Sequence, residues 1–337
     1  MFDPSVHVKY FIRCLGLLPS RYESEDSNRL ALTYFCICAL DLLNALNQLP
    51  EKETIIDWIY TQLVEESDHC GFRGSDIYRD CGSYDVANLA ATGFALQILV
   101  SLGDDLERLD KDKVSRFVDL CQRPNGSFSP IVGFGEDDLR YCMLAMMIKR
   151  LLRVDPTDSS KLIEYIHSTL AFDGGLSMNE GAESHAGLTY CGLSALKLAG
   201  KLEPRDWVST IDFLVHRQVQ FNIHNEPELQ NDYADPDDFG GFNGRENKYA
   251  DTCYAFWCVA ALELLNESKL VDRDAMIRFL LSQTLSRITG GFTKTNSPDE
   301  IPDPFHSFLG IAVLGIVNQE KTIANVDVAV VLRKNRL

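Results

Sequence analysis

The chain has 337 residues, of which 45% are hydrophobic and 24% charged, and its formal net charge is −17. That composition is typical of a folded globular protein and excludes a disordered chain. The acidic balance speaks against general binding to nucleic acid or anionic membranes, so an anionic ligand needs a local basic cluster. Scattered cysteines without a CxxC pair, and a start without an apolar leader, predict free thiols and a cytoplasmic location. No run of residues is apolar enough to predict a transmembrane helix.

In chain order, the sequence repeats a pair of helices about every fifty residues. Amphipathic segments with apolar residues three and four apart predict outer helices at 8–18, 55–64, 114–122, 161–170, 207–218 and 275–284. More continuously apolar segments predict buried inner helices at 29–46, 86–100, 139–152, 185–199, 251–265 and 305–317. Short glycine-containing stretches separate most outer helices from the inner helices that follow, at 70–72, 125–128, 174–176, 240–242 and 290–292.

Six inner and six outer helices predict an all-α fold, a closed α/α toroid in a single domain that spans 1–337. An open solenoid is the alternative, but it needs polar end caps and has no reason to make one helix of each pair so apolar. The polar stretch at 221–238 interrupts the pattern and predicts an acidic surface-loop insertion. Its Asp235-Pro236-Asp237-Asp238 matches the D-x-D-D motif of terpene cyclases that protonate their substrates. A solvated loop is the simpler interpretation, because an acid of that kind needs an apolar cavity.

Polar residues at the starts of the inner helices are the candidate functional residues. Asp251 and Cys253 begin the fifth inner helix, and His306 begins the sixth at nearly the same phase of the repeat. We expect these three side chains to converge, which gives a three-ligand metal site with one open position, the pattern of a catalytic zinc. Taken singly, Cys253 has an ordinary interpretation as a thiol of the core, and His306 has one as an imidazole that caps a helix.

Basic residues gather at the same helix starts, although the chain as a whole is acidic. The set comprises His185, Arg245, Lys248 and Lys294, with the hydroxyl of Tyr254 beside them. Helix N-termini favour anions, so the set predicts a diphosphate or carboxylate site, with solvated loop residues as the alternative. Aromatic side chains expected to line an apolar tunnel beneath are Phe35, Tyr190, Phe256, Trp257 and Phe305, unless they only pack the core. Alkylation of a thiol by an allylic diphosphate uses metal, cations and tunnel, whereas zinc-assisted hydrolysis leaves the aromatic barrel unexplained.

The sequence resembles the β subunits of protein prenyltransferases, most closely those of geranylgeranyltransferase type I. The resemblance covers nearly the whole chain and is most specific in CGFRGS (70–75), ESHAGLTYCGLSAL (183–196), GRENKYADTCYAFW (244–257) and the segment from GGFTK to DPFHSF. It implies zinc on Asp251, Cys253 and His306. It implies diphosphate contacts from His185, Arg245, Lys248 and Tyr254, with Tyr254 and Lys294 in catalytic roles.

Two positions make the resemblance specific to the type I enzyme. Ala31 stands where farnesyltransferases carry a bulky Trp, which implies room for a geranylgeranyl chain. Lys294 stands where farnesyl and Rab-type enzymes carry a magnesium-binding Asp, which implies that Mg²⁺ is dispensable. Two residues are added between Lys294 and His306, and DPFHSF also resembles the Rab-type subunit. Arg140 resembles an arginine near the C-terminus of the bound peptide.

The resemblance also implies partners and substrates. These are a prenyltransferase α subunit in a heterodimer, geranylgeranyl diphosphate, and proteins that end in a CaaX motif, such as Rho-type small GTPases. A Rab-type geranylgeranyltransferase or a farnesyltransferase β subunit is the closest alternative. A non-catalytic toroid that only binds a partner is the more distant one, and it gives no reason for three potential metal ligands in phase.

Overall fold

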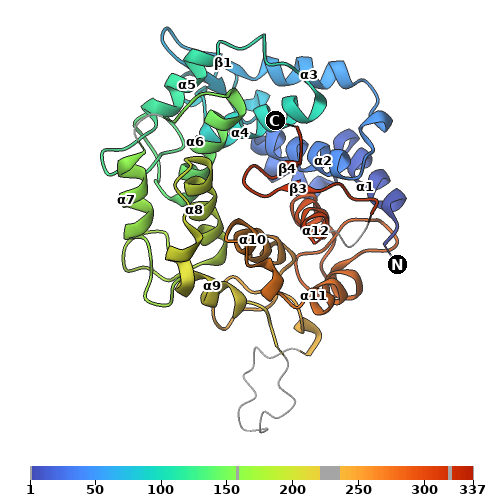
Figure 1. Cartoon of the computed structure of the whole chain (residues 1–337). Coiled ribbons are helices and arrows are strands. Elements are labelled where there is room, and N and C mark those ends of the chain that lie inside the picture. Colours follow the sequence, from blue (N-terminus) through green and yellow to red (C-terminus); the bar gives the residue numbers. More distant parts are fainter. Residues whose placement is uncertain (1, 157–158, 221–235, 318–320, 337) are drawn as a thin grey trace.

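The computed structural model describes residues 2–156, 159–220, 236–317 and 321–336. Within these residues six inner helices form a ring (Figure 1). They are α2 (Arg29–Leu42), α4 (Leu89–Leu102), α6 (Leu139–Leu152), α8 (Ala186–Leu198), α10 (Thr252–Leu264) and α12 (Pro304–Ile316). Each packs against the next, and α12 packs against α2. The ring is therefore closed, which confirms the predicted toroid and excludes an open solenoid.

The outer helices alternate with the inner ones along the chain and surround them (Figure 1). They are α1 (Pro4–Gly16), α3 (Lys52–Thr61), α5 (Lys111–Leu120), α7 (Ser160–Ser168), α9 (Val208–Val215) and α11 (Arg273–Phe279). Each buries one face, as α5 does with Val114, Phe117 and Val118, whereas α10 is buried along nearly its whole length. This difference is what the amphipathic and continuously apolar patterns predict.

The outer helices end earlier than the sequence pattern predicts. α9 stops at Val215 and is preceded by a 3₁₀ turn at Pro204–Trp207, and α11 passes into a π-helical turn at Leu280–Thr284. After α3 the chain forms the antiparallel pair β1 (Leu63–Glu65) and β2 (Cys70–Phe72). Later repeats make single bridges at the same place, which join 122 to 128, 170 to 176, 218 to 242 and 285 to 292.

The repeated glycines lie where one helix pair touches the next. Gly126 has a φ of +94°, and a Cβ there would lie 2.1 Å from the Lys161 carbonyl oxygen in α7. Gly290 has a φ of +75°, and its Cβ would lie 2.5 Å from the Val6 carbonyl oxygen in α1. Only glycine combines that conformation with so close an approach. The contact between Gly290 and Val6 joins the final repeat to the first. The same close approach of a glycine to the next helix therefore spaces the repeats and closes the ring.

All the inner helices start at one end of the barrel. The first N–H of an inner helix repeatedly donates to a carbonyl in the segment that leads into the next one, as Ala186 does to Gly244 and Thr252 does to Lys294. Polar side chains cap five of these starts: Asn88, Asp138, His185, Asp251 and Asp303. The caps explain why polar residues intrude on otherwise apolar helices at this end, which we call the open end.

The opposite end is covered by a C-terminal hairpin that the sequence did not predict. Its strands β3 (Val326–Asp327) and β4 (Leu332–Arg333) lie over the interior of the ring (Figure 1). Three successive carbonyls accept hydrogen bonds from inner-helix side chains: Val328 from Tyr190 (2.6 Å), Ala329 from Ser194 (2.8 Å) and Val330 from Gln97 (2.7 Å). Arg336 pairs with Asp41 near the end of α2 at 2.5 Å. We call residues 321–336 the C-terminal plug.

Only the end of the expected acidic loop, at 236–238, lies within the described residues. Residues 221–235, including Asp235 of the D-x-D-D match, lie outside the described residues. Pro236–Asp238 forms a 3₁₀ turn. Asp238 is only 2% exposed, and its Oδ2 accepts a hydrogen bond from the Ala250 N–H at 2.8 Å. The expectation of a solvated loop is thus wrong for Asp238, whose carboxylate fixes the approach to α10.

The described residues also show whether any helix could span a membrane and whether the cysteines are paired. None of the helices described there has the length and apolar character needed to cross a bilayer. All ten cysteines lie within the described residues, and each is a free thiol.

Candidate metal and anion site at the open end

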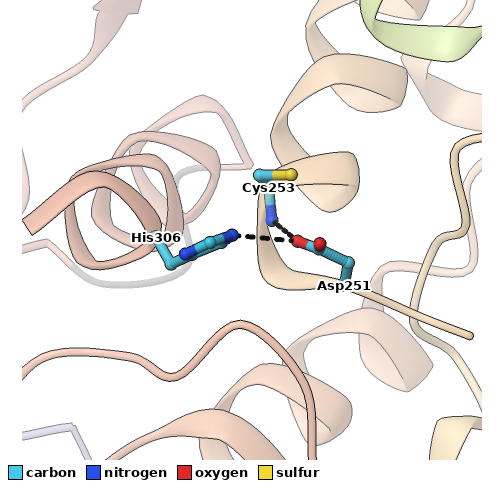
Figure 2. A group of neighbouring side chains, drawn as sticks. All are labelled: Asp251, Cys253 and His306. Atoms are coloured by element: carbon cyan, nitrogen blue, oxygen red, sulfur yellow. Dashed lines mark hydrogen bonds and ion pairs between the residues drawn. The ribbon is translucent and has the colours of Figure 1, made fainter. Parts of the chain in front are cut away.

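Three potential metal ligands meet between α10 and α12. Asp251 caps α10, Cys253 lies in its first turn, and His306 lies in the first turn of α12. Their ligand atoms all lie within 4.8 Å of one another, and His306 Nε2 is 3.4 Å from Asp251 Oδ1. Figure 2 shows the imidazole pointing across to the carboxylate, with the Cys253 sulfur beside them. One oxygen, one sulfur and one nitrogen donor can therefore bind a single metal ion and leave a further position open.

Asp303 holds the His306 ring in this orientation. Its Oδ2 is 2.6 Å from His306 Nδ1, while its Oδ1 accepts a hydrogen bond from the His306 N–H at 2.9 Å. Burial alone would lower the pKa of His306, but hydrogen bonds to Asp251 and Asp303 raise it to about 9. A carboxylate on the far nitrogen is the arrangement that orients metal-binding histidines. Asp303 is not among the residues predicted from the sequence, although an Asp three residues before a helix-start histidine is a capping signal.

The environment of Cys253 determines whether its thiol is protonated. Burial raises the pKa of Cys253 well above its usual value, and the neighbouring Asp251 raises it further, while Lys294 opposes the shift. Without a cation the thiol therefore keeps its proton, and so does the imidazole of His306. A metal ion reverses that preference, because thiolate and neutral imidazole are the forms that bind metal.

His185 and Tyr254 form a second pair at the open end, 2.8 Å apart between His185 Nε2 and Tyr254 Oη. His185 Nδ1 accepts the Gly187 N–H at 3.1 Å, which caps α8. Burial and Arg245 both lower the pKa of His185, so the ring is neutral near pH 7. Its one proton must then be on Nε2 and is donated to Tyr254. The hydroxyl proton of Tyr254 remains available to a ligand.

Gly244 sets the position of this pair, and sequence reasoning did not single it out. A Cβ at Gly244 would lie 2.2 Å from Tyr254 Cζ, so the ring packs directly on the backbone. The Gly244 carbonyl accepts the first N–H of α8, from Ala186, at 2.9 Å. The glycine thus fixes Tyr254 on α10 against the start of α8, where His185 lies.

The predicted cations lie at the same end but in different settings. Arg245 is ion-paired with Glu183, an acidic residue that the sequence did not single out. Lys248 and Lys294 are exposed. The Lys294 carbonyl accepts the Thr252 N–H at 2.8 Å, which places this lysine beside the start of α10 and close enough to act on the Cys253 thiol.

An apolar cavity of about 350 Å³ runs from this rim into the barrel, from His185 and Arg140 to Val331 in the plug. Of the expected tunnel residues, Phe35, Trp257 and Phe305 line it. Asp138 binds the Arg140 guanidinium at 2.6 Å and raises its pKa. The cavity fits an elongated apolar ligand whose polar head stays at the rim.

Three residues predicted for the tunnel lie elsewhere. Tyr190 is fully buried behind the wall, where its ring packs on Trp257 at 5.0 Å and its hydroxyl binds the plug. Phe256 is buried in the core. Ala31 lines a second cavity of about 200 Å³, which shares Ala90 and Phe94 with the first. Any effect of Ala31 on chain length must therefore act through that neighbouring space.

The model of the prenyltransferase alpha-alpha toroid domain matches residues 2–332. The chain belongs to this prenyltransferase family. It is 30% identical to the geranylgeranyl transferase type-1 subunit beta of Arabidopsis thaliana, across 95% of this chain and 86% of that protein. It is 31% identical to the subunit of the same name from Dictyostelium discoideum, across 92% of this chain and 89% of that protein.

A solved member of the prenyltransferase family has nearly the same structure. It is described as Candida albicans protein geranylgeranyltransferase-I complexed with GGPP, and it matches with a TM-score of 0.93 and 34% identity. The match covers 100% of this chain and 97% of that one. The family resemblance predicted from the sequence is confirmed, and these three relatives are all type I enzymes or their β subunits.

Proposed function

We propose that this protein is the catalytic β subunit of a type I protein geranylgeranyltransferase. It transfers the geranylgeranyl group from geranylgeranyl diphosphate to the cysteine of a C-terminal CaaX motif. The observation that carries the proposal is the junction at the open end. Three potential metal ligands lie at the starts of α10 and α12, and the apolar cavity opens beside the His185–Tyr254 pair. The three type I relatives support the same function.

The ligands of a zinc ion would be Asp251, Cys253 and His306, with Asp303 holding the imidazole. Sulfur, imidazole and carboxylate donors with an open position suit zinc. A zinc ion there would lower the pKa of a substrate thiol, so that the CaaX cysteine is a nucleophilic thiolate near neutral pH.

The other open-end residues act on the leaving diphosphate. The Tyr254 hydroxyl donates its free proton to a phosphate oxygen, and His185 holds that hydroxyl in place. Arg245 exchanges its contact with Glu183 for the diphosphate. Lys248 and Lys294 supply further positive charge, and the N-termini of α8 and α10 add their dipoles. Lys294 takes the role of a magnesium ion, so Mg²⁺ is dispensable.

The cavity holds the isoprenoid and the rim holds the peptide. Phe35, Trp257 and Phe305 bury the apolar chain and leave its diphosphate-bearing carbon at the open end. Arg140, held by Asp138, faces the mouth of the cavity and binds the C-terminal part of the CaaX peptide. Attack by the cysteine sulfur on that carbon forms a thioether and releases diphosphate.

The protein acts in a heterodimer with a prenyltransferase α subunit, in the cytoplasm. Its substrates are proteins with a C-terminal CaaX motif, such as Rho-type small GTPases. The names of the A. thaliana and D. discoideum relatives, each a subunit beta, support a partner subunit.

The proposal is tested with the protein co-expressed with a prenyltransferase α subunit. A peptide that ends in CaaX with Leu last is incubated with equal farnesyl and geranylgeranyl diphosphate, and its mass is measured. We expect the mass of a geranylgeranyl thioether, and no change in a matched peptide with Ser in place of Cys. A farnesyl adduct would identify a farnesyltransferase. Modification only with an added escort protein and Mg²⁺ would identify a Rab-type enzyme, and an unmodified peptide would indicate a binding module.

A further inference from the structure

The C-terminal plug contains a valine in a backbone conformation that valine rarely adopts. Val331 has a φ of +51°, in the left-handed region. A β-branched residue there is an outlier, because its side chain crowds the backbone. Such outliers persist only where the surrounding structure enforces them, and they gather at functional sites. The strained residue is also 5% exposed, so its side chain faces the interior of the barrel.

Hydrogen bonds on the preceding residues enforce this conformation. The carbonyls of Val328, Ala329 and Val330 are each bound by a side chain from α4 or α8. Gln97 lies at the centre of this arrangement, because its Nε2 binds the Val330 carbonyl at 2.7 Å and the Tyr34 hydroxyl at 3.2 Å.

An ion pair holds the other side of the plug. Asp41, near the end of α2, is 1% exposed, and its two carboxylate oxygens bind Nη2 and Nε of Arg336 at 2.5 and 2.8 Å. The plug is therefore fixed to α2, α4 and α8, and Val331 is held between these attachments. It cannot relax by moving away from the ring.

Val331 lines the far end of the 350 Å³ cavity, opposite the rim at His185. Gln97, which binds the Val330 carbonyl of the plug, and Tyr34, whose hydroxyl accepts a hydrogen bond from Gln97, line the same cavity. An apolar ligand whose head is bound at the rim extends its tail towards this end. The isopropyl group of Val331 is then the part of the plug that the tail meets.

We infer that Val331 is the floor of the isoprenoid cavity and that its side chain limits the length of the chain that the barrel accepts. The inference rests on the proposed function, since it needs an isoprenoid in the cavity. It assigns the plug a role in substrate choice in addition to its role in closing the barrel. A glycine would adopt the same backbone without strain but would leave the cavity deeper.

Two substitutions change the floor in opposite directions. Val331→Gly keeps the backbone conformation and deepens the cavity, whereas Val331→Phe makes it shallower. Val330→Ala is the matched control, because it shortens a neighbouring buried valine that does not line the cavity. Equilibrium binding of farnesyl, geranylgeranyl and geranylfarnesyl diphosphate is measured by competition on each purified heterodimer, without peptide.

We expect Val331→Gly to raise affinity for geranylfarnesyl relative to geranylgeranyl diphosphate by about tenfold, and Val331→Phe to favour farnesyl by a similar factor. The control should leave both ratios unchanged. Ratios that stay the same in both Val331 variants, with wild type still binding geranylgeranyl diphosphate, would overturn the inference alone. A wild type that binds none of the three diphosphates would overturn the proposed function and the inference with it.

Discussion

The two ends of the barrel are made by the same six inner helices, yet they present opposite chemistry. At the open end, the helix N-termini and the side chains that cap them bring acidic, basic and sulfur groups together. At the plugged end, a hairpin with an apolar tip covers the ring and closes the apolar cavity on that side. Helix N-termini attract anions and polar caps, so a ring of parallel helices concentrates polar groups at one mouth. The proposed function places the chemistry of the diphosphate at one end and the recognition of chain length at the other.

At the open end, the residues that cap the inner helices also supply or orient the candidate functional groups. Asp251 caps α10 and offers a metal ligand, and His185 caps α8 while holding Tyr254. Asp303 caps α12 and orients His306. The helix starts therefore fix the functional groups without a separate scaffold. Changes at this end should affect chemistry strongly, and changes at the other should affect stability and chain choice.

The largest effect is expected for Cys253→Ala, which removes the sulfur donor. Loss of the metal should lower turnover of the CaaX peptide by about 1,000-fold or more, because several kcal/mol of transition-state stabilisation depend on it. Zinc content, measured by elemental analysis, should fall with it, while binding of geranylgeranyl diphosphate stays. Cys258→Ala, five residues further along α10 and buried in the core, is the matched control and should keep its zinc. Normal zinc in the Cys253 variant would rule out the metal assignment.

Zinc affinity should rise steeply with pH. The pKa of His306 is raised to about 9 and that of Cys253 lies well above its usual value, so both groups carry protons at neutral pH. Binding releases two protons, and affinity should then grow by up to about 100-fold per pH unit below pH 9. Competition with a chelating dye at several pH values measures this. An affinity independent of pH would mean that these two side chains are not ligands.

Tyr254→Phe should lower kcat for transfer by about 100-fold, the usual loss when one donor to a developing negative charge is removed. KM for the peptide should change little, because Tyr254 contacts the leaving group. Phe keeps the ring packed on Gly244, so thermal unfolding should match that of wild type. An unchanged kcat would remove Tyr254 from the chemistry.

A change at Lys294 tests how the negative charge of the leaving diphosphate is stabilised. Wild-type turnover should be the same with and without Mg²⁺ in zinc-replete buffer. Lys294→Asp should lose about tenfold in kcat without Mg²⁺ and regain most of it when Mg²⁺ is added. If wild-type activity collapsed without Mg²⁺, the role assigned to this ammonium group would be wrong.

The smallest effect on turnover, about twofold or less, is expected for Asp41→Asn at the plugged end. Its effect should appear in stability, because Asp41 is buried and pairs with Arg336. Removal of the charge should cost about 3 kcal/mol in the free energy of unfolding, measured in denaturant. Asp57→Asn, which breaks the exposed pair with Arg108, should cost about 0.5 kcal/mol or less. Equal losses in the two variants would mean that the plug pair does not hold the barrel closed.

Much of the open end could be predicted from the sequence, because the repeat carries the information. The inner helices are apolar all round, and the repeat phase puts Cys253 and His306 at one level on neighbouring helices. The contact between Arg245 and Glu183 could not be predicted in the same way. It joins surface loops far apart in the sequence, and no local pattern relates them.

The plugged end could not be predicted, for physical reasons. The short apolar run at 326–332 is compatible with a strand, a buried turn or the end of a helix. Val331 adopts a conformation that its residue type disfavours, so local preferences point the wrong way. Tyr190 has the apolar ring expected of a tunnel wall, but its hydroxyl binds the Val328 carbonyl of the plug. Only the folded ring brings these groups together.

The account assigns the diphosphate to the open end of the barrel and the hydrocarbon tail to the plugged end. The orientation of the bound lipid tests this assignment most directly. A geranylgeranyl diphosphate analogue with a photoreactive group at the end of its hydrocarbon tail is bound to the heterodimer and irradiated. Mass spectrometry then maps the cross-linked residues. We predict labels on the plug around Val331 or on the adjoining Tyr34 and Phe94. Labels on the open-end segments 244–254 or 294–306 would contradict the account, because the tail would then lie where the diphosphate and the metal are assigned.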